Sequence, residues 1–88
     1  MKKREGLERM YDILDAMRGL GRSQNTRKLI IRANLTYSSY NNYISILINK
    51  GLIIKEGKVY LITRRGLDFM YKFRDLMIFL RGLEKNGL

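Results

Sequence analysis

The stretch that decides the fold runs from residue 25 to residue 62 and reads NTRKLIIRANLTYSSYNNYISILINKGLIIKEGKVYLI. Asn25 is a favourable N-cap, and the apolar spacing after it predicts a short helix over Thr26–Ala33. Asn34 tolerates the left-handed conformation that ends a helix. Thr36 is the next favourable N-cap, and we expect a helix from there to about Lys50. The stretch therefore begins with two helices joined by a tight turn.

Two short runs with strand composition follow the second of these helices. Residues 52–55 and 58–62 are rich in β-branched and aromatic side chains, which predicts strands. Glu56-Gly57 between them predicts a two-residue hairpin turn. The order of elements is typical of a helix-turn-helix followed by a β-hairpin wing.

Further helices are expected on both sides of this stretch. The first covers about residues 4–17 and is ended by Gly19 and Gly21. Its apolar face comprises Leu7, Met10, Tyr11, Leu14 and Met17. The last helix begins after the N-cap Thr63 and reaches about Lys85. We therefore expect a mainly α fold with a small β-hairpin, that is, a winged helix-turn-helix with an added C-terminal helix.

The helix that begins after Thr36 has an unusual exposed face. Steps of about 100° per residue place its apolar side chains in one sector: Tyr40, Tyr43, Ile44, Leu47 and Ile48. The opposite side holds small polar residues: Ser38, Ser39, Asn41, Asn42, Ser45 and Asn49. Ser and Asn are poor helix formers, so helix propensity does not account for their presence. Ile46 lies outside the apolar sector and has no explanation in this pattern.

The composition excludes several kinds of chemistry. The 88 residues include neither Cys nor His, which excludes thiol and imidazole catalysis and the usual ligands of zinc. We therefore expect neither an enzyme nor a protein that binds a metal, a cofactor or a small-molecule substrate. The N-terminus lacks the apolar stretch of a signal peptide, and no run is long enough to span a membrane. The expected location is the cytoplasm, in association with the nucleoid.

The segment that contains the helix-turn-helix carries bases without acids. The chain has 18 Lys and Arg against 8 Asp and Glu, a formal net charge of +10. Residues 16–55 contain no acidic side chain and carry these bases: Arg18, Arg22, Arg27, Lys28, Arg32, Lys50 and Lys55. An unopposed positive field attracts polyanions and speeds their association. Because the acid-free segment coincides with the helix-turn-helix, we expect double-stranded DNA as the partner.

The polar helix is expected to enter the major groove, where base pairs differ in their donors and acceptors. The side chains predicted to reach base edges are Ser38, Ser39, Asn41, Asn42 and Ser45, while Tyr37 contacts sugar or phosphate. Phosphate contacts are expected from Arg27 and Lys28, and backbone or minor-groove contacts from Lys55 and Lys58. Further candidates for contacts with the DNA backbone are a loose arm of Lys2, Lys3 and Arg4, and the pair Arg64 and Arg65. No Arg, the commonest reader of guanine, lies on the groove-facing side, which predicts modest specificity with a preference for A·T pairs.

The C-terminal helix carries two apolar stripes. One has heptad spacing and is predicted to form a dimer seam: Phe69, Phe73, Leu76, Leu80 and Leu83. The other comprises Leu67, Tyr71 and Ile78. Two stripes indicate that the helix covers its own domain with one and contacts a second chain with the other. Internal packing of both stripes is the alternative. We expect a DNA-binding domain over residues 1–63 and a dimerisation helix over residues 64–88, in one compact unit.

A resemblance to a known family follows from the central stretch. The residues that carry it are Ala33-Asn34-Leu35-Thr36-Tyr37, Tyr43-Ile44, Leu47, Gly51-Leu52-Ile53, Glu56-Gly57-Lys58, Tyr60 to Thr63, and Gly66. This pattern is similar to that of small archaeal winged-helix DNA-binding proteins, in particular the ten-kilodalton chromatin-associated family. The resemblance implies a homodimer in which the C-terminal helices pair as an antiparallel coiled coil and each protomer offers a winged helix to DNA. The C-terminal helix here departs from the family in being shorter and more apolar.

Several roles fit this pattern. A winged helix serves both gene-specific transcription regulators and architectural chromatin proteins, of cellular or viral origin. A protein-interaction module that docks a different partner through the apolar C-terminal helix is the main alternative. Binding to an anionic membrane surface is a weaker alternative, because the bases lie on the helix-turn-helix and not along one amphipathic helix. RNA binding stays open, although the sequence indicates no platform of exposed aromatic residues.

Overall fold

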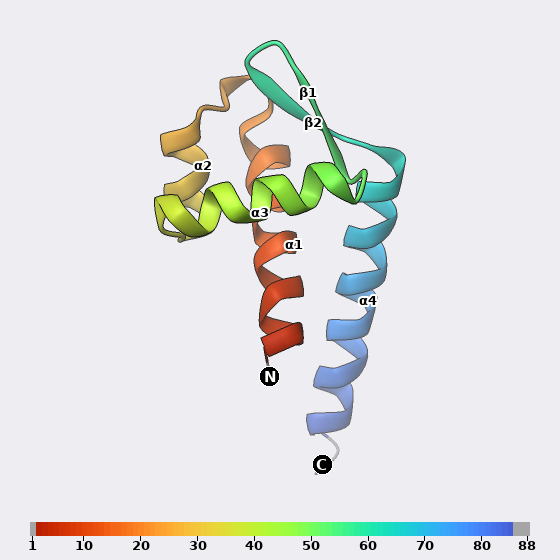
Figure 1. The fold of residues 1–88 in the computed structure, drawn as a ribbon. Coiled ribbons are helices and arrows are strands. Elements are labelled where there is room, and N and C mark those ends of the chain that lie inside the picture. The colour runs from red at the N-terminus through yellow and green to blue at the C-terminus, as the bar shows by residue number, and fades with distance from the viewer. Residues whose placement is uncertain (1, 86–88) are drawn as a thin grey trace.

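The computed structural model describes the backbone of residues 2–85 and the side chains of residues 6–84. The elements follow one another in the predicted order, and the fold is mainly α with one antiparallel hairpin (Figure 1). They are α1 (Lys2–Leu20), the 3-10 turn η1 (Gly21–Ser23), α2 (Thr26–Ala33), α3 (Tyr37–Asn49), β1 (Ile53–Glu56), β2 (Val59–Ile62) and α4 (Arg64–Lys85). The predicted fold class is confirmed.

The helix-turn-helix has the caps that its sequence predicts. Oδ1 of Asn25 accepts a hydrogen bond from the backbone N–H of Lys28 at 2.8 Å. Oγ1 of Thr36 accepts one from the N–H of Ser39 at 3.1 Å. Asn34 adopts the left-handed conformation with φ of 57° and ends α2. Asn34 and Thr36 fix the two ends of the turn between α2 and α3, and Asn25 caps the start of α2.

Helix α1 is longer than the predicted residues 4–17. It begins at Lys2 and continues through Gly19 to Leu20. One glycine in a helix costs only about 1 kcal/mol, so Gly19 does not stop the helix. The helix ends where Gly21 adopts a positive φ of 54°. A Cβ at Gly19 would lie 2.6 Å from Nη2 of Arg32, so this glycine lets the Arg32 side chain of α2 cross α1 closely.

The hairpin turn lies one residue later than predicted. Strands β1 and β2 pair antiparallel in a register that joins Glu56 to Val59. The loop is therefore Gly57-Lys58, and the predicted turn at Glu56-Gly57 is wrong. Gly57 has a positive φ of 62° at the first loop position, where a type II′ turn requires glycine. With glycine in that position, Glu56 becomes the last residue of β1.

Helix α1 forms the centre of the core, and α3 crosses in front of it (Figure 1). The largest fully buried side chains are Ile13, Leu14 and Met17 of α1, Leu29 of α2, Leu47 of α3, Ile53 of β1 and Met70 of α4. Two predictions for α3 are wrong. Ile48, predicted to be buried, is 45 % exposed, and Ile46, which the pattern left unexplained, packs against the core.

Thr63 fixes the junction between β2 and α4. Its Oγ1 accepts a hydrogen bond from Gly66 N at 3.0 Å, as expected of an N-cap, and donates one to Gly51 O at 2.6 Å. A Cβ at Gly66 would meet the carbonyl oxygen of Leu52 and lie 2.6 Å from Cγ2 of Ile62. The first turn of α4 therefore packs directly on the backbone at the base of the wing.

Helix α4 divides its predicted heptad seam between two environments. Phe69 and Phe73 pack within the protomer, with ring centroids 5.9 Å apart, and Phe73 lies 5.3 Å from the ring of Tyr11 on α1. Leu76 is exposed, while Leu80 and Leu83 are half-buried. The prediction of one continuous seam facing a second chain is therefore wrong for its first half, because α1 covers that part of α4.

Candidate nucleic-acid interface

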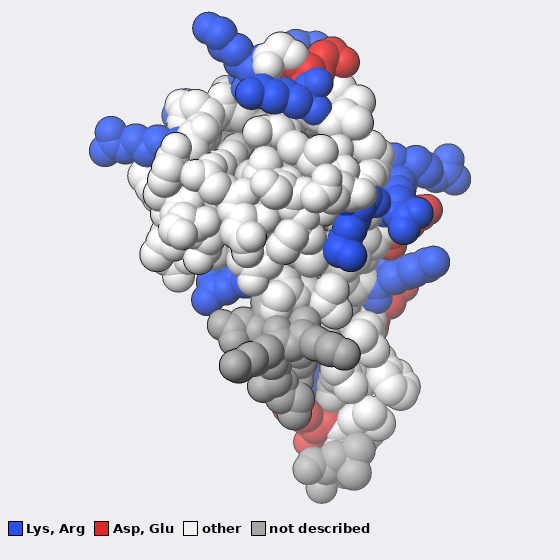
Figure 2. Space-filling model, in the orientation of Figure 1, with Lys and Arg blue, Asp and Glu red and all other residues white. Residues whose placement is uncertain are grey.

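The outward side of α3 is polar and uncharged. Its exposed polar side chains are Ser38, Asn41, Asn42, Ser45 and Asn49, and the apolar Ile48 is exposed beside them. The Ser45 hydroxyl donates a hydrogen bond to the Asn41 carbonyl oxygen at 3.3 Å. Figure 2 shows that the surface over α3 is free of Lys, Arg, Asp and Glu, while Lys and Arg stand around it over α2, the wing and the start of α4. This arrangement leaves amide and hydroxyl groups available at the centre and positive charge at the edge.

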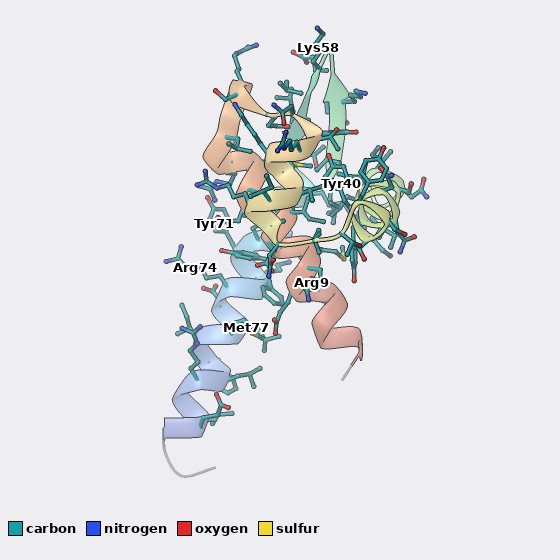
Figure 3. All side chains as sticks on the ribbon, turned by 90° about the vertical axis from the view of Figure 1, so that its left-hand side faces the viewer. Arg9, Tyr40, Lys58, Tyr71, Arg74 and Met77 are labelled. Atoms are coloured by element: carbon teal, nitrogen blue, oxygen red, sulfur yellow. The ribbon has the colours of Figure 1, made fainter. Side chains whose placement is uncertain are left out.

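The opposite side of α3 holds the helix in place. Tyr40, Ile44 and Leu47 are buried there, and Figure 3 shows Tyr40 between α2 and α3. Burial raises the pKa of the Tyr40 phenol, and the neighbouring Tyr60 adds to this shift, which the Thr26 hydroxyl opposes. The phenol is therefore neutral at physiological pH, and Tyr40 acts as a rigid wedge between the two helices.

Two bases begin α2. Arg27 and Lys28 are exposed in its first turn, which contains no acidic residue. A helix N-terminus presents free backbone N–H groups and a partial positive charge, so these bases add to a field that already favours anions. Of the backbone N–H groups in this first turn, the Asn25 side chain accepts a hydrogen bond from that of Lys28 only. Helix α2 lies beside the N-terminal end of α3, so the predicted phosphate contacts border the polar face (Figure 1).

The wing carries its bases at and near the tip. Lys58 lies in the loop at the top of the hairpin (Figure 3). Lys55 lies on β1 with Nζ 5.8 Å from the centre of the Tyr60 ring, close enough for a cation–π contact. The carboxamide of Gln24 joins the hairpin to the segment before α2 through two hydrogen bonds to the Tyr60 backbone. The structure therefore brings both predicted wing bases to one end of the molecule.

Other predicted residues lie at varied distances from this face. Tyr37 is exposed at the start of α3, and the Ser39 side chain is half-buried. Lys2, Lys3 and Arg4, predicted as a loose arm, belong by their backbone to α1, and their side chains lie outside the described residues. Arg64 and Arg65 are exposed in the first turn of α4.

Sequence reasoning missed two contributors to this region. Gln24 positions the wing, but its partner is 36 residues away and no local pattern reveals it. Ile31, which no sequence pattern singled out, is 67 % exposed on α2 in the turn after the two bases. The position of Gln24 depends on how distant elements meet, which periodicity does not determine.

These elements are those of a known family. The sequence profile that describes the winged helix-turn-helix matches residues 3–81, nearly the whole chain. The chain belongs to the winged helix-turn-helix family. No curated protein matches it. In winged helix-turn-helix terms, α3 is the recognition helix and the hairpin β1–β2 is the wing, and membership of this family suggests a DNA-binding function.

Neither a metal-ion cluster nor a membrane-spanning helix is found in the part of the chain that the structure describes. Among the described side chains of residues 6–84, no three acidic groups lie close enough together to hold a metal ion. Over the same residues, no helix combines the length and the apolar character needed to cross a bilayer.

Proposed function

We propose that the chain binds double-stranded DNA as a homodimer, with α3 of each protomer in the major groove. The observation that carries this proposal is the uncharged, hydrogen-bonding face of α3 bordered by bases on α2 and on the wing. A face meant only for water needs no such composition, since Lys and Glu favour a helix more than Ser and Asn do. Membership of the winged helix-turn-helix family supports the same partner.

In this arrangement the residues divide into two groups. Those that read base edges are Ser38, Ser39, Asn41, Asn42 and Ser45, and Asn is suited to adenine because it donates and accepts at once. Those that hold the backbone are Arg27, Lys28, Tyr37, Lys55 and Lys58. Because the reading group contains no Arg, we expect modest specificity with a preference for A·T pairs.

The homodimer rests on the second half of α4. Residues 76–80 read LMIFL, which makes the helix apolar on all sides over more than one turn. Ile78 and Phe79 are 58 % and 62 % exposed, whereas Met77 and Leu80 are half-buried. A helix that is apolar all round is normally buried, so this segment requires cover beyond its own protomer.

A second copy of the chain is a suitable cover. A groove of about 540 Å³ lies between α1 and α4 and is lined by Tyr11, Phe73, Met77 and Leu80. Its charged border contains both signs, Glu8 and Glu84 with Arg74 and Arg81. A two-fold interface brings the same surface of both protomers together, so a border of mixed sign is able to match itself. We place the dimer contact at Leu76, Leu80 and Leu83 of the predicted seam, together with Ile78 and Phe79.

Two biological roles fit a dimer of this kind, a transcription regulator and a chromatin-associated protein, both at the nucleoid. The polar face of α3 favours selective reading, and the high net charge favours general coating of DNA. Footprinting on genomic DNA separates the two roles. Protection confined to one site indicates a regulator, and continuous protection at high protein ratios indicates an architectural protein.

The DNA proposal is tested by fluorescence anisotropy with a labelled random-sequence duplex across a salt series. A dimer that contacts about eight phosphates should give a slope of log K against log salt near −7. Zwitterionic and anionic vesicles serve as controls. Absence of binding to the duplex at low salt overturns the proposal, and capture by anionic vesicles alone favours a membrane surface.

Sedimentation equilibrium tests the dimer. The variant Ile78→Asp/Phe79→Asp should be monomeric and folded, because both side chains are exposed in the protomer. Phe73→Ala is unsuitable, since Phe73 also packs on Tyr11. A monomeric native chain overturns the homodimer and favours docking of a different partner on α4.

A further inference from the structure

A group of bases lies at the far end of α3 from Arg27 and Lys28. A hollow of about 460 Å³ opens where α1, the end of α3 and the first turns of α4 meet. Its polar lining consists of Lys50, Arg65, Asp68 and Lys72. We call Lys50, Arg65 and Lys72 the α3–α4 basic cluster. All three side chains are exposed.

The backbone holds these bases together. Lys50 is the C-cap of α3, and the following turn is tied to α4 by the hydrogen bonds from Thr63 Oγ1 to Gly51 O and from Thr63 N to Leu52 O. A Cβ at Gly51 would lie 3.8 Å from Cδ of Arg65, so the Arg65 side chain runs along this turn. Lys72 follows Arg65 by seven residues and therefore lies on the same side of α4.

Ordinary helix electrostatics account for the cluster only in part. The C-terminal carbonyl groups of α3 attract a cation, which accounts for Lys50. The start of α4, however, disfavours positive charge for the same reason, and it carries Arg64 and Arg65 together. No ion pair among the described residues involves the cluster, and Asp68 is the one acid in its hollow. Two adjacent arginines at a helix start indicate an anion that the protomer does not supply.

We propose that the α3–α4 basic cluster binds DNA phosphates on the strand across the major groove from those held by Arg27 and Lys28. Figure 1 shows α2 at one end of α3 and the start of α4 at the other, and Figure 2 shows bases beside both ends. Helix α3 has 13 residues, a length of about 20 Å, while the major groove is about 12 Å wide. A helix in the groove therefore carries bases at its two ends to opposite borders. This inference rests on the proposed DNA-binding function.

The test compares salt slopes of matched variants on the same random-sequence duplex. Lys50→Gln/Arg65→Gln removes two bases of the cluster and should make the slope shallower by about two per protomer. Lys72→Gln alone should make it shallower by about one per protomer. Asp68→Asn removes the acid among the bases and should tighten binding several-fold. Circular dichroism establishes that each variant is folded.

The matched control for Lys72→Gln is Arg18→Gln, which removes one positive charge elsewhere. Arg18 lines a hollow with Leu67, one turn from Tyr71, which Figure 3 shows on the side of the molecule away from α3. We expect the control to keep the native slope within about half a unit. Equal changes of slope in Lys72→Gln and Arg18→Gln, or no change in the cluster variants, overturn the cluster while leaving DNA binding intact. Absence of binding by the native chain overturns the proposed function and the cluster with it.

Discussion

The side-chain amide of Gln24 pairs with the backbone of Tyr60 as a neighbouring strand would. Nε2 of Gln24 donates to Tyr60 O at 2.9 Å, and Oε1 accepts from Tyr60 N at 2.9 Å. Nε2 also lies 3.5 Å from the carbonyl oxygen of Met17. Tyr60 faces Lys55 across the hairpin, in a pair whose N–H and C=O groups point away from the partner strand. Gln24 therefore satisfies both backbone groups at the outer edge of β2 and ties the wing to α1.

Loss of this pairing should loosen the wing. Gln24→Ala removes two good hydrogen bonds, and we expect the free energy of unfolding to fall by about 1–3 kcal/mol. Gln24→Glu keeps the shape of the side chain but loses the donor to Tyr60 O. At neutral pH its free energy of unfolding should therefore fall by a similar amount. Amide hydrogen exchange at Tyr60 should accelerate in both variants. Ser23→Ala is the control, and unchanged exchange at Tyr60 in Gln24→Ala would contradict the role given to Gln24.

Two glycines of α4 should respond in opposite ways to alanine. At Gly66 a methyl group would collide with Leu52 O and Ile62 Cγ2, so Gly66→Ala should destabilise the fold by about 3 kcal/mol. At Gly82 a methyl group meets nothing within 4 Å, and alanine is the better helix former. Gly82→Ala should therefore stabilise the fold by up to about 1 kcal/mol. Urea denaturation of the two variants measures both effects, and destabilisation of similar size would argue against the packing at Gly66.

Asp12 should make stability depend on pH in the acidic range. Partial burial raises its pKa above the ordinary 3.8, and the nearby carboxylates of Glu8 and Asp15 add to this shift, which Arg9 opposes. A raised pKa in the folded state means that folding favours the protonated acid, so this contribution is present at low pH and is lost as pH rises through that pKa. Asp12→Asn should therefore raise the urea midpoint at pH 7 and leave it unchanged at pH 3. A gain of equal size at both pH values would point to another cause.

Mutations of the side chains proposed to read bases and of those proposed to contact phosphates should have different effects on DNA binding. Asn41→Ala/Asn42→Ala should reduce the preference for A·T-rich duplexes and leave the salt slope unchanged, because neither side chain is charged. Arg27→Gln/Lys28→Gln should weaken binding to all duplexes alike and make the slope shallower by about two per protomer. Anisotropy titrations with A·T-rich and G·C-rich duplexes measure both. A shallower slope in the asparagine variant would place these residues at the backbone instead.

Features set by nearest neighbours were predictable from sequence. Asn25, Thr36 and Thr63 cap helices through hydrogen bonds to residues three positions later, and Asn34 ends α2 through its own backbone conformation. The exposed polar side of α3 was predictable too, because helical periodicity alone separates it from Tyr40 and the other buried residues.

Features set by contacts between distant elements were not predictable in this way. Gln24 binds the backbone of Tyr60, 36 residues later in the chain, and Phe73 packs on Tyr11 because the fold places α1 against α4. Heptad spacing on α4 shows that Phe73 needs an apolar neighbour but does not tell whether that neighbour belongs to the same chain. The one-residue shift of the turn at Gly57 has a similar origin, since either placement gives a two-residue loop and only the register of the strands decides.

The neutral face of α3 has a consequence for how fast a site is found. On a duplex held by bases at the edge of the interface, each phosphate is equivalent to the next, so displacement by one base pair exchanges equal contacts. The asparagines and serines of α3 carry no net charge, and they add little to the barrier between neighbouring positions until a matching pattern is met. In the proposed binding mode the molecule can thus travel along DNA in one dimension with its reading face already at the groove, and the distance covered before dissociation lengthens as salt is lowered.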